Sequence, residues 1–118
     1  MSDEKLKIYI KPTCTTCRKA LKILREEGAE FSAVNYFEEP LTRKELTGLI
    51  EKLGVPAREL LRKNEKIYKE LGLSKKELSE KEIIDLLVRY PDLLQRPIVR
   101  KGGRVILARP AEKIEKLI

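Results

Sequence analysis

The sequence predicts an α/β protein in which a small, mixed four-stranded sheet is flanked by helices. Three observations support this class. Leu6, Ile8 and Ile10 alternate with Lys7 and Tyr9, which is the periodicity of a strand. Several later segments repeat apolar residues at helical spacing. Near the end of the chain, two short apolar runs flank a Lys-Gly-Gly segment, which predicts a hairpin.

The first third predicts a strand, a helix and a second strand. We expect the first strand over residues 5–10 and the helix over 15–27, because Gly28 stands where a helix C-terminus favours glycine. The second strand is expected over 31–36. A helical connection allows the two strands to pair in parallel through a right-handed crossover.

The middle of the chain predicts helices only. Thr42 and Ser79 each precede a glutamate by three residues, and this capping-box pattern indicates the start of a helix. Between these two helices, residues 57–73 predict one or two short helices, with Gly72 as a stop.

The last third predicts the hairpin and a final helix. The hairpin strands are expected over 96–100 and 104–108, adding antiparallel neighbours to the sheet. Pro110 is expected in the first turn of the final helix. We therefore expect one domain spanning residues 1–118, with a helical insertion at about 42–90.

Composition limits the partners and the compartment. The formal net charge is +7, with 38% charged residues. This charge admits an anionic partner, nucleic acid included, but Lys and Arg alternate with Glu, which is equally typical of solvated helix faces. No direct contact with nucleic acid is expected. No apolar run approaches the roughly 18 residues of a membrane span, and residues 1–5 lack a signal-peptide core. A cytoplasmic protein without a membrane partner is expected.

The two cysteines, Cys14 and Cys17, form a C-x-x-C motif between the first strand and helix. Cys14 is expected at the first turn of the helix, where free N–H groups and the helix dipole favour an anion. A thiol there has a lowered pKa and acts as a nucleophilic thiolate. Cys17 is close enough in sequence to close a disulfide with Cys14. The motif therefore predicts thiol chemistry.

The chain contains no histidine and no other cysteine, so a structural zinc site is not expected. The usual general base of a Ser or Cys hydrolase is also missing. Activation of Cys14 must therefore come from the helix terminus and from fixed positive charge.

A C-x-x-C that opens a helix, with an X-Pro before a later strand, resembles the thioredoxin-like fold. A narrower resemblance, to the glutaredoxin-linked arsenate reductase family, covers essentially the whole chain. It rests on an ordered set of motifs: LLRKNE at 60–65, Tyr68 followed by LGL at 71–73, RPIV at 96–99 and RP at 109–110.

The resemblance implies a role for five residues. Cys14 matches the cysteine that attacks arsenate, Pro97 matches a cis-proline, and Arg62, Arg96 and Arg109 match the arginines that bind the oxyanion. Three guanidiniums would offset the repulsion between a thiolate and arsenate. They would also keep the thiol ionised. Taken singly, each arginine also fits an ordinary structural role at the surface, in a helix cap or in an ion pair.

The resemblance further implies arsenic detoxification without a tightly bound cofactor or a metal. The expected reductant is an external thiol system, either glutathione with glutaredoxin or thioredoxin. Cys17 stands where single-cysteine members of the family usually have serine, so we expect it to act as a resolving thiol. An attack by Cys17 would leave a Cys14–Cys17 disulfide for the external system to reduce.

Two other functions remain open. An Spx-like redox-sensing regulator that binds RNA polymerase shares the fold, the CTxCRK segment at 14–19 and an Arg-Pro-Ile motif. Such regulators typically lack the Arg-Pro at 109–110, so arsenate reduction ranks first. A general thiol–disulfide oxidoreductase is the third reading, and a family member with the same residues but another substrate is also compatible with the sequence.

Overall fold

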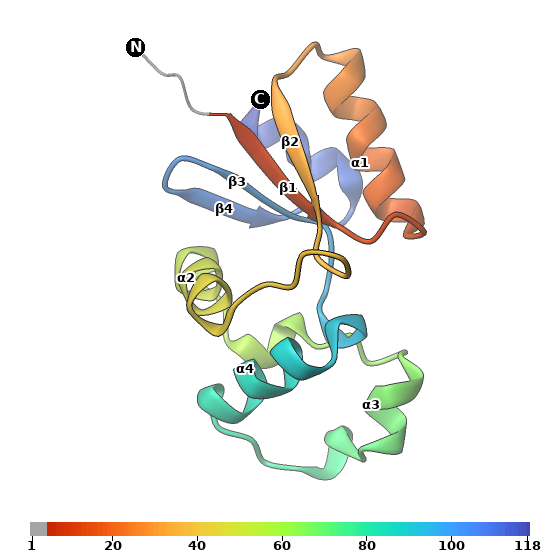
Figure 1. Ribbon diagram of the computed structural model, residues 1–118, viewed down its shortest axis with the longest axis vertical. Coiled ribbons are helices and arrows are strands. Elements are labelled where there is room, and N and C mark those ends of the chain that lie inside the picture. The colour runs from red at the N-terminus through yellow and green to blue at the C-terminus, as the bar shows by residue number, and fades with distance from the viewer. Residues whose placement is uncertain (1–4) are drawn as a thin grey trace. The chain divides into compact units, whose positions relative to one another are not determined.

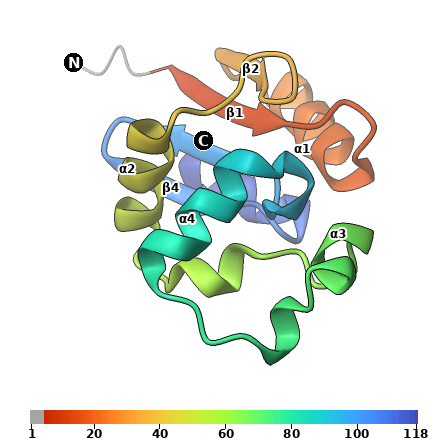
Figure 2. The ribbon, with the colours of Figure 1, turned by 60° about the horizontal axis from the view of Figure 1, so that its bottom comes forward.

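The computed structural model describes residues 5–118 as two compact units (Figures 1 and 2). The sheet unit combines the N-terminal segment up to Glu39 with Arg96–Ile118, and the helical unit is Pro40–Gln95. Residues 1–4, on which the expectation about a signal peptide partly rests, lie outside the described residues.

The sheet unit contains four strands in the order β2-β1-β3-β4. β1 pairs in parallel with β2 and antiparallel with β3, and β3 pairs antiparallel with β4. This arrangement confirms the predicted mixed four-stranded sheet of an α/β fold. The strands are β1 (Leu6–Ile10), β2 (Phe31–Asn35), β3 (Ile98–Lys101) and β4 (Arg104–Leu107).

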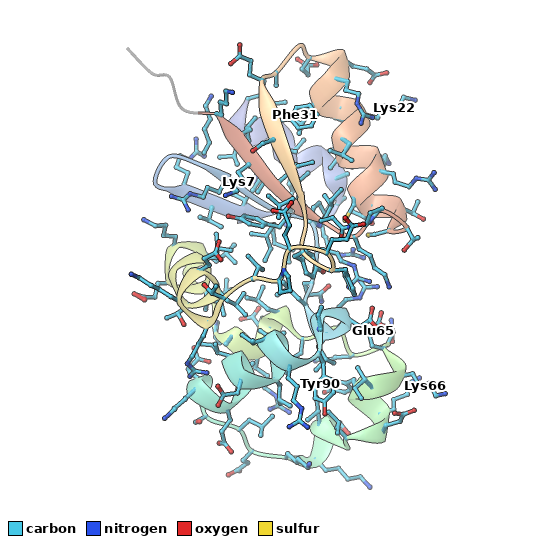
Figure 3. The ribbon with its side chains drawn as sticks, viewed as in Figure 1. Lys7, Lys22, Phe31, Glu65, Lys66 and Tyr90 are labelled. Atoms are coloured by element: carbon cyan, nitrogen blue, oxygen red, sulfur yellow. The ribbon has the colours of Figure 1, made fainter. Side chains whose placement is uncertain are left out.

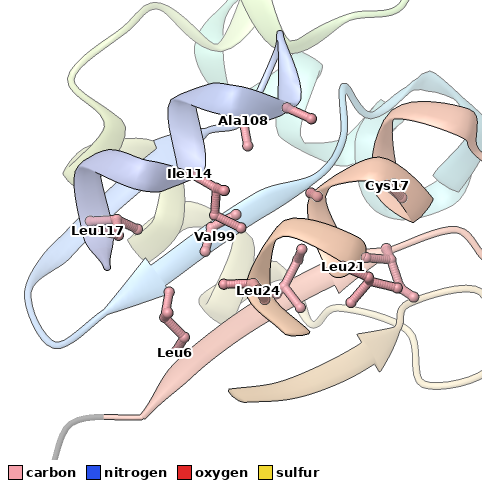
Figure 4. Packing of buried hydrophobic residues seen from close by; sticks show 12 residues of the cluster. Leu6, Cys17, Leu21, Leu24, Val99, Ala108, Ile114 and Leu117 are labelled. Carbon is pink, nitrogen blue, oxygen red and sulfur yellow. The ribbon is translucent and has the colours of Figure 1, made fainter. Parts of the chain in front are cut away.

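One face of the sheet carries the apolar core of this unit (Figure 4). Ile8 of β1 lies opposite Val99 of β3, so their side chains share a face. The helix α1 (Thr15–Glu26) packs against the 3₁₀ helix η4 (Ala111–Leu117), and both supply residues to the core. Cys17 is one of the core residues, which fixes the first turn of α1 on the sheet.

Both ends of α1 follow from local sequence. Cys14 is the N-cap, one residue before the first turn in which we expected it. The helix ends at Glu26, and Gly28 has φ = 67°, a conformation that glycine adopts without a steric penalty.

Several boundaries differ from the prediction by one or two residues, including the end of α1 at Glu26 and the end of β4 at Leu107. β2 ends at Asn35 and not at residue 36. β3 begins at Ile98, not at residue 96, because Pro97 has no N–H group to donate to the ladder. Pro110 is the residue before η4, not part of its first turn.

In the helical unit, α2 (Arg43–Leu53) packs against α4 (Glu80–Arg89). Each helix begins with a complete capping box, as predicted, formed by Thr42 with Glu45 and by Ser79 with Glu82. The described helices are too short and too polar to cross a lipid bilayer.

The segment between α2 and α4 is more broken than the one or two helices predicted. It contains η1 (Ala57–Leu60), α3 (Lys66–Glu70) and η2 (Leu73–Lys75). Leu61 is extended and forms an isolated bridge with Leu94, which interrupts helix formation after η1. Gly72 has φ = 63° and separates α3 from η2. A further 3₁₀ helix, η3 (Pro91–Leu93), follows α4.

Candidate active site

Cys14 lies where β1 has ended and α1 begins. The turn before it is closed by the Cys14 N–H group, which donates to the Lys11 carbonyl at 2.9 Å. The Cys14 sulfur accepts a hydrogen bond from the backbone N–H of Cys17 at 3.4 Å. The sulfur therefore occupies the anion-favouring position at the N-terminus of a twelve-residue helix.

The surroundings of Cys14 stabilise its thiolate. Partial burial raises the pKa of the thiol, but hydrogen bonds from the Cys17 backbone, the Cys17 thiol and Arg96 together bring it below its ordinary value. The positive charge of Arg96 acts in the same direction. The side chain is half-buried, so its sulfur is still accessible. These are the properties of a reactive cysteine.

Cys17 differs from Cys14 in both burial and thiol pKa. It has 0% exposure, and burial raises the pKa of its thiol to about 12, against the effect of a backbone hydrogen bond with Lys11. The charge and hydrogen bond of Cys14 also favour the protonated form of Cys17. Cys14 therefore loses its proton at a lower pH than Cys17, and between the two pKa values the pair contains a thiolate at Cys14 and a thiol at Cys17. Both are free cysteines in this structure.

Arg96 is the buried cation of this site. It has 4% exposure, and its Nη1 donates to the Tyr36 hydroxyl at 3.4 Å. Burial lowers the pKa of the guanidinium, but Tyr36 and Cys14 oppose this, and the net shift is upward. Arg96 therefore stays charged beside the Cys14 sulfur. The peptide bond to Pro97 is cis.

Arg109 is tied to Arg96 through the backbone. Its Nη1 donates to the Arg96 carbonyl at 2.9 Å, and this half-buried residue lies two positions after the end of β4. The Ala108 N–H donates to the Pro97 carbonyl at 3.0 Å, which holds the two Arg-Pro segments side by side. The peptide bond between Arg109 and Pro110 is also cis. The structure thus brings Cys14, Arg96 and Arg109 into one cluster.

Arg62 belongs to the helical unit. Its backbone N–H donates to the Leu93 carbonyl at 2.7 Å, and its Nε donates to Glu65 at 3.0 Å (Glu65 is labelled in Figure 3). Its Nη1 is buried and has no hydrogen-bond partner among residues 5–118. A buried, unsatisfied guanidinium donor is costly, and an anionic ligand would satisfy it.

Sequence reasoning missed two aromatic residues of the cluster, Tyr36 and Phe37. Their rings lie 4.9 Å apart, and the Phe37 ring also faces two cations, with Lys11 Nζ at 4.8 Å and Arg96 Cζ at 5.8 Å. Both follow the end of a strand that is parallel to β1. The carboxyl ends of parallel strands are where α/β proteins place ligands, and that rule could have identified them.

The chemistry of the cluster is that of a thiolate next to fixed cations. Within the part of the chain that the structure describes, no three His, Cys, Asp or Glu side chains gather as metal ligands do. The sulfur can attack an electrophile, and the guanidinium groups can bind a negatively charged one. The buried thiol of Cys17 can then attack the Cys14 sulfur.

Known proteins resemble this chain along almost all of its length. The sequence model of the ArsC family matches residues 9–117. The arsenate reductase of Escherichia coli (strain K12) is 39% identical over 111 residues, which cover 94% of this chain and 79% of that protein. Uncharacterized protein YfgD of the same strain is 39% identical over 116 residues, which cover 98% of both proteins.

Among solved structures, the arsenate reductase from Vibrio cholerae superposes with a TM-score of 0.91. That protein is 30% identical to this chain, and the match covers 98% of both chains.

Proposed function

This chain belongs to the ArsC family, and we propose that it reduces arsenate through nucleophilic attack by the Cys14 thiolate on an oxyanion bound by arginine side chains. It is an enzyme of the arsenate reductase class. The observation that carries the proposed mechanism is the cluster around Cys14. The sulfur accepts a hydrogen bond from a helix N-terminus, and this bond and the neighbouring Arg96 lower the pKa of the thiol.

Binding is the first requirement, because arsenate and the thiolate are both negative. Arg96 neutralises the sulfur, and Arg109, tied to the Arg96 carbonyl, offers its remaining donors to the arsenate oxygens. We propose Arg62 as the third ligand. Its place in the family motif and its unsatisfied Nη1 support this assignment.

In the first chemical step, the Cys14 sulfur donates an electron pair to As(V), and an S–As bond forms. An arsenate oxygen leaves with protons as water. The product is an arsenic(V) adduct bound to the Cys14 sulfur, and arsenic has not yet been reduced.

In the second step, the Cys17 sulfur attacks the Cys14 sulfur. The S–As bond breaks, its electron pair stays on arsenic, and arsenite leaves as As(III). The two sulfurs form a disulfide, and the Cys17 proton is passed to the departing arsenite or to water. Because the pKa of Cys17 is raised to about 12, this thiol must lose its proton during the attack and not before it.

The cycle closes when an external dithiol reduces the Cys14–Cys17 disulfide. We propose thioredoxin or a glutaredoxin with glutathione as this partner, in the cytoplasm, because a reducing compartment keeps both cysteines as thiols between turnovers. No bound cofactor takes part in this scheme.

The test is arsenate-dependent NADPH oxidation, measured separately with a thioredoxin system and with a glutathione–glutaredoxin system. We expect turnover by the wild-type chain and none by Cys14→Ser. Cys17→Ser is the matched control at the second cysteine, and we expect it to lose turnover with thioredoxin and retain it with glutathione, since glutathione can replace the missing resolving thiol.

Three outcomes would contradict the scheme. Full arsenate reduction by Cys14→Ser would exclude Cys14 as the nucleophile. An unchanged reductant preference in Cys17→Ser would exclude Cys17 as the resolving thiol. Reduction of small disulfides without any arsenate-dependent turnover would instead indicate a general thiol–disulfide oxidoreductase.

A further inference from the structure

Tyr36 contacts the site from a position to which the motifs assign no role. Its hydroxyl accepts the hydrogen bond from Arg96 Nη1, and its side chain is as buried as that of Arg96, with 2% exposure against 4%. A buried guanidinium needs hydrogen-bond acceptors to offset its lost hydration. Tyr36 supplies one of them without introducing a second full charge.

The position of Tyr36 is set by the sheet. Its N–H donates to the carbonyl of Ile10, the last residue of β1, at 3.3 Å. The chain turns directly after Ile10 and reaches Cys14 through the hydrogen bond to Lys11 O. Tyr36 and the turn that leads to Cys14 therefore follow the adjacent ends of two parallel strands, β2 and β1.

Phe37 supports the same guanidinium. The Asn35 side chain accepts a hydrogen bond from the Phe37 N–H at 3.0 Å, which fixes the turn after β2. This turn places the Phe37 ring under the cations of Arg96 and Lys11. Arg96 is thus held by a hydroxyl and by an aromatic face.

We propose that Tyr36 is a positioning residue, whose hydroxyl holds the Arg96 guanidinium beside the Cys14 sulfur. The role rests on the proposed function, in which that sulfur is the nucleophile. Tyr36 acts on the sulfur through Arg96, because Cys17 and Arg96 are the side chains that shift the pKa of Cys14. Arg109 contacts Arg96 at its carbonyl, and Lys11 faces Phe37.

The test removes one hydroxyl and measures the Cys14 thiolate. In a Cys17→Ser background, where only one thiol remains, the rate of alkylation by iodoacetamide is followed against pH with and without Tyr36→Phe. Without the Tyr36 hydroxyl, the guanidinium is held less firmly beside the sulfur, so the pKa of Cys14 should rise. At a pH below the pKa of Cys14, one net hydrogen bond corresponds to an alkylation rate roughly three- to tenfold lower.

Two controls separate positioning from a general loss of structure. Tyr9→Phe removes the hydroxyl of an equally buried tyrosine on β1, and it should leave the alkylation profile unchanged. In an Arg96→Gln background, Tyr36→Phe should have no further effect, because the group it positions is gone. Thermal unfolding of each variant confirms that the comparison is made between folded proteins.

The proposal is overturned if Tyr36→Phe leaves the Cys14 profile unchanged, or if it lowers the rate equally with and without Arg96. Alkylation needs no arsenate, so this result is independent of the proposed activity. If Tyr36→Phe slows alkylation of Cys14 as expected but the wild-type chain never reduces arsenate, the proposed function alone is contradicted. Arsenate turnover with no Tyr36 effect would contradict the positioning role alone.

Discussion

Two cysteines that are three residues apart have opposite titration behaviour. Hydrogen bonds and the Arg96 charge outweigh burial at Cys14, whereas burial dominates at Cys17. Between the two pKa values the folded chain carries one thiolate and one thiol. This difference supports the proposed roles of Cys14 as nucleophile and Cys17 as resolving thiol without any reference to the substrate.

We therefore expect iodoacetamide to modify one thiol per chain near neutral pH, at Cys14. As the pH falls through the lowered pKa of Cys14, modification slows, but at a lower pH than for an ordinary thiol. Cys17 reacts only in denaturant or as the pH approaches about 12. Peptide mass spectrometry of the labelled chain measures the extent of modification at each cysteine as a function of pH.

Cys14→Ser is the control for this labelling, and it should remove native-state modification while leaving one reactive thiol in the denatured chain. Equal labelling of both cysteines in the native protein would contradict the difference in burial and charge.

At the residue level, the sequence singled out the cysteines and arginines because their chemistry is distinctive. Tyr36 has no such mark, because an aromatic residue at the end of a strand usually packs in a core. Only the pairing of Tyr36 with Ile10, a tertiary feature, brings its hydroxyl to Arg96. The contact between Arg109 and the Arg96 carbonyl was equally hidden, because it joins residues at the ends of two different strands.

Among the elements, the capped helices were the most predictable. The capping boxes at Thr42 and Ser79 are local patterns, and the structure contains both. The segment at 57–73 was less predictable, since its breaks depend on the bridge between Leu61 and Leu94, which are distant in sequence. The start of β3 was predicted two residues too early, at residue 96, for a local reason, the missing N–H group of Pro97.

Thr42→Ala tests how much a cap contributes to the helical unit. The Thr42 hydroxyl accepts a hydrogen bond from the Glu45 N–H at 3.1 Å, and losing it should lower the free energy of unfolding by about 1 kcal/mol. Urea denaturation measures this.

Thr47→Ala is the matched control in the same helix. The Thr47 hydroxyl donates to the Arg43 carbonyl within the helix and satisfies no free N–H group at the helix start. Alanine also has a higher helix propensity than threonine. Its unfolding free energy should stay the same or rise slightly. Equal destabilisation by both substitutions would show that the cap has no special contribution.

At the scale of the whole molecule, the formal charge of +7 favours anionic reagents over neutral ones. Both units carry lysines, for example Lys22 on α1 of the sheet unit and Lys66 on α3 of the helical unit (Figure 3). Screening by salt weakens such long-range effects, with a Debye length of about 10 Å at 0.1 M.

We expect Cys14 to react faster with iodoacetate, relative to neutral iodoacetamide, than a free thiol does in low salt. The advantage should shrink as sodium chloride is added, because screening acts on the anion alone. Rates with both reagents over a salt series measure the ratio, and free cysteine of the same thiolate fraction is the control. A ratio that does not change with salt would show that the net charge has no influence at Cys14.

The sheet unit is discontinuous, and this has a consequence for biosynthesis. The central pair of strands joins Ile8 to Val99, and the helical unit lies between them in the chain. While a ribosome is still translating the middle of the chain, β1 has no β3 to pair with. Its apolar face cannot yet be covered by the core residues that follow residue 96. Arg96 emerges in the same late segment, so a chain released before that point has a Cys14 thiol without its cation.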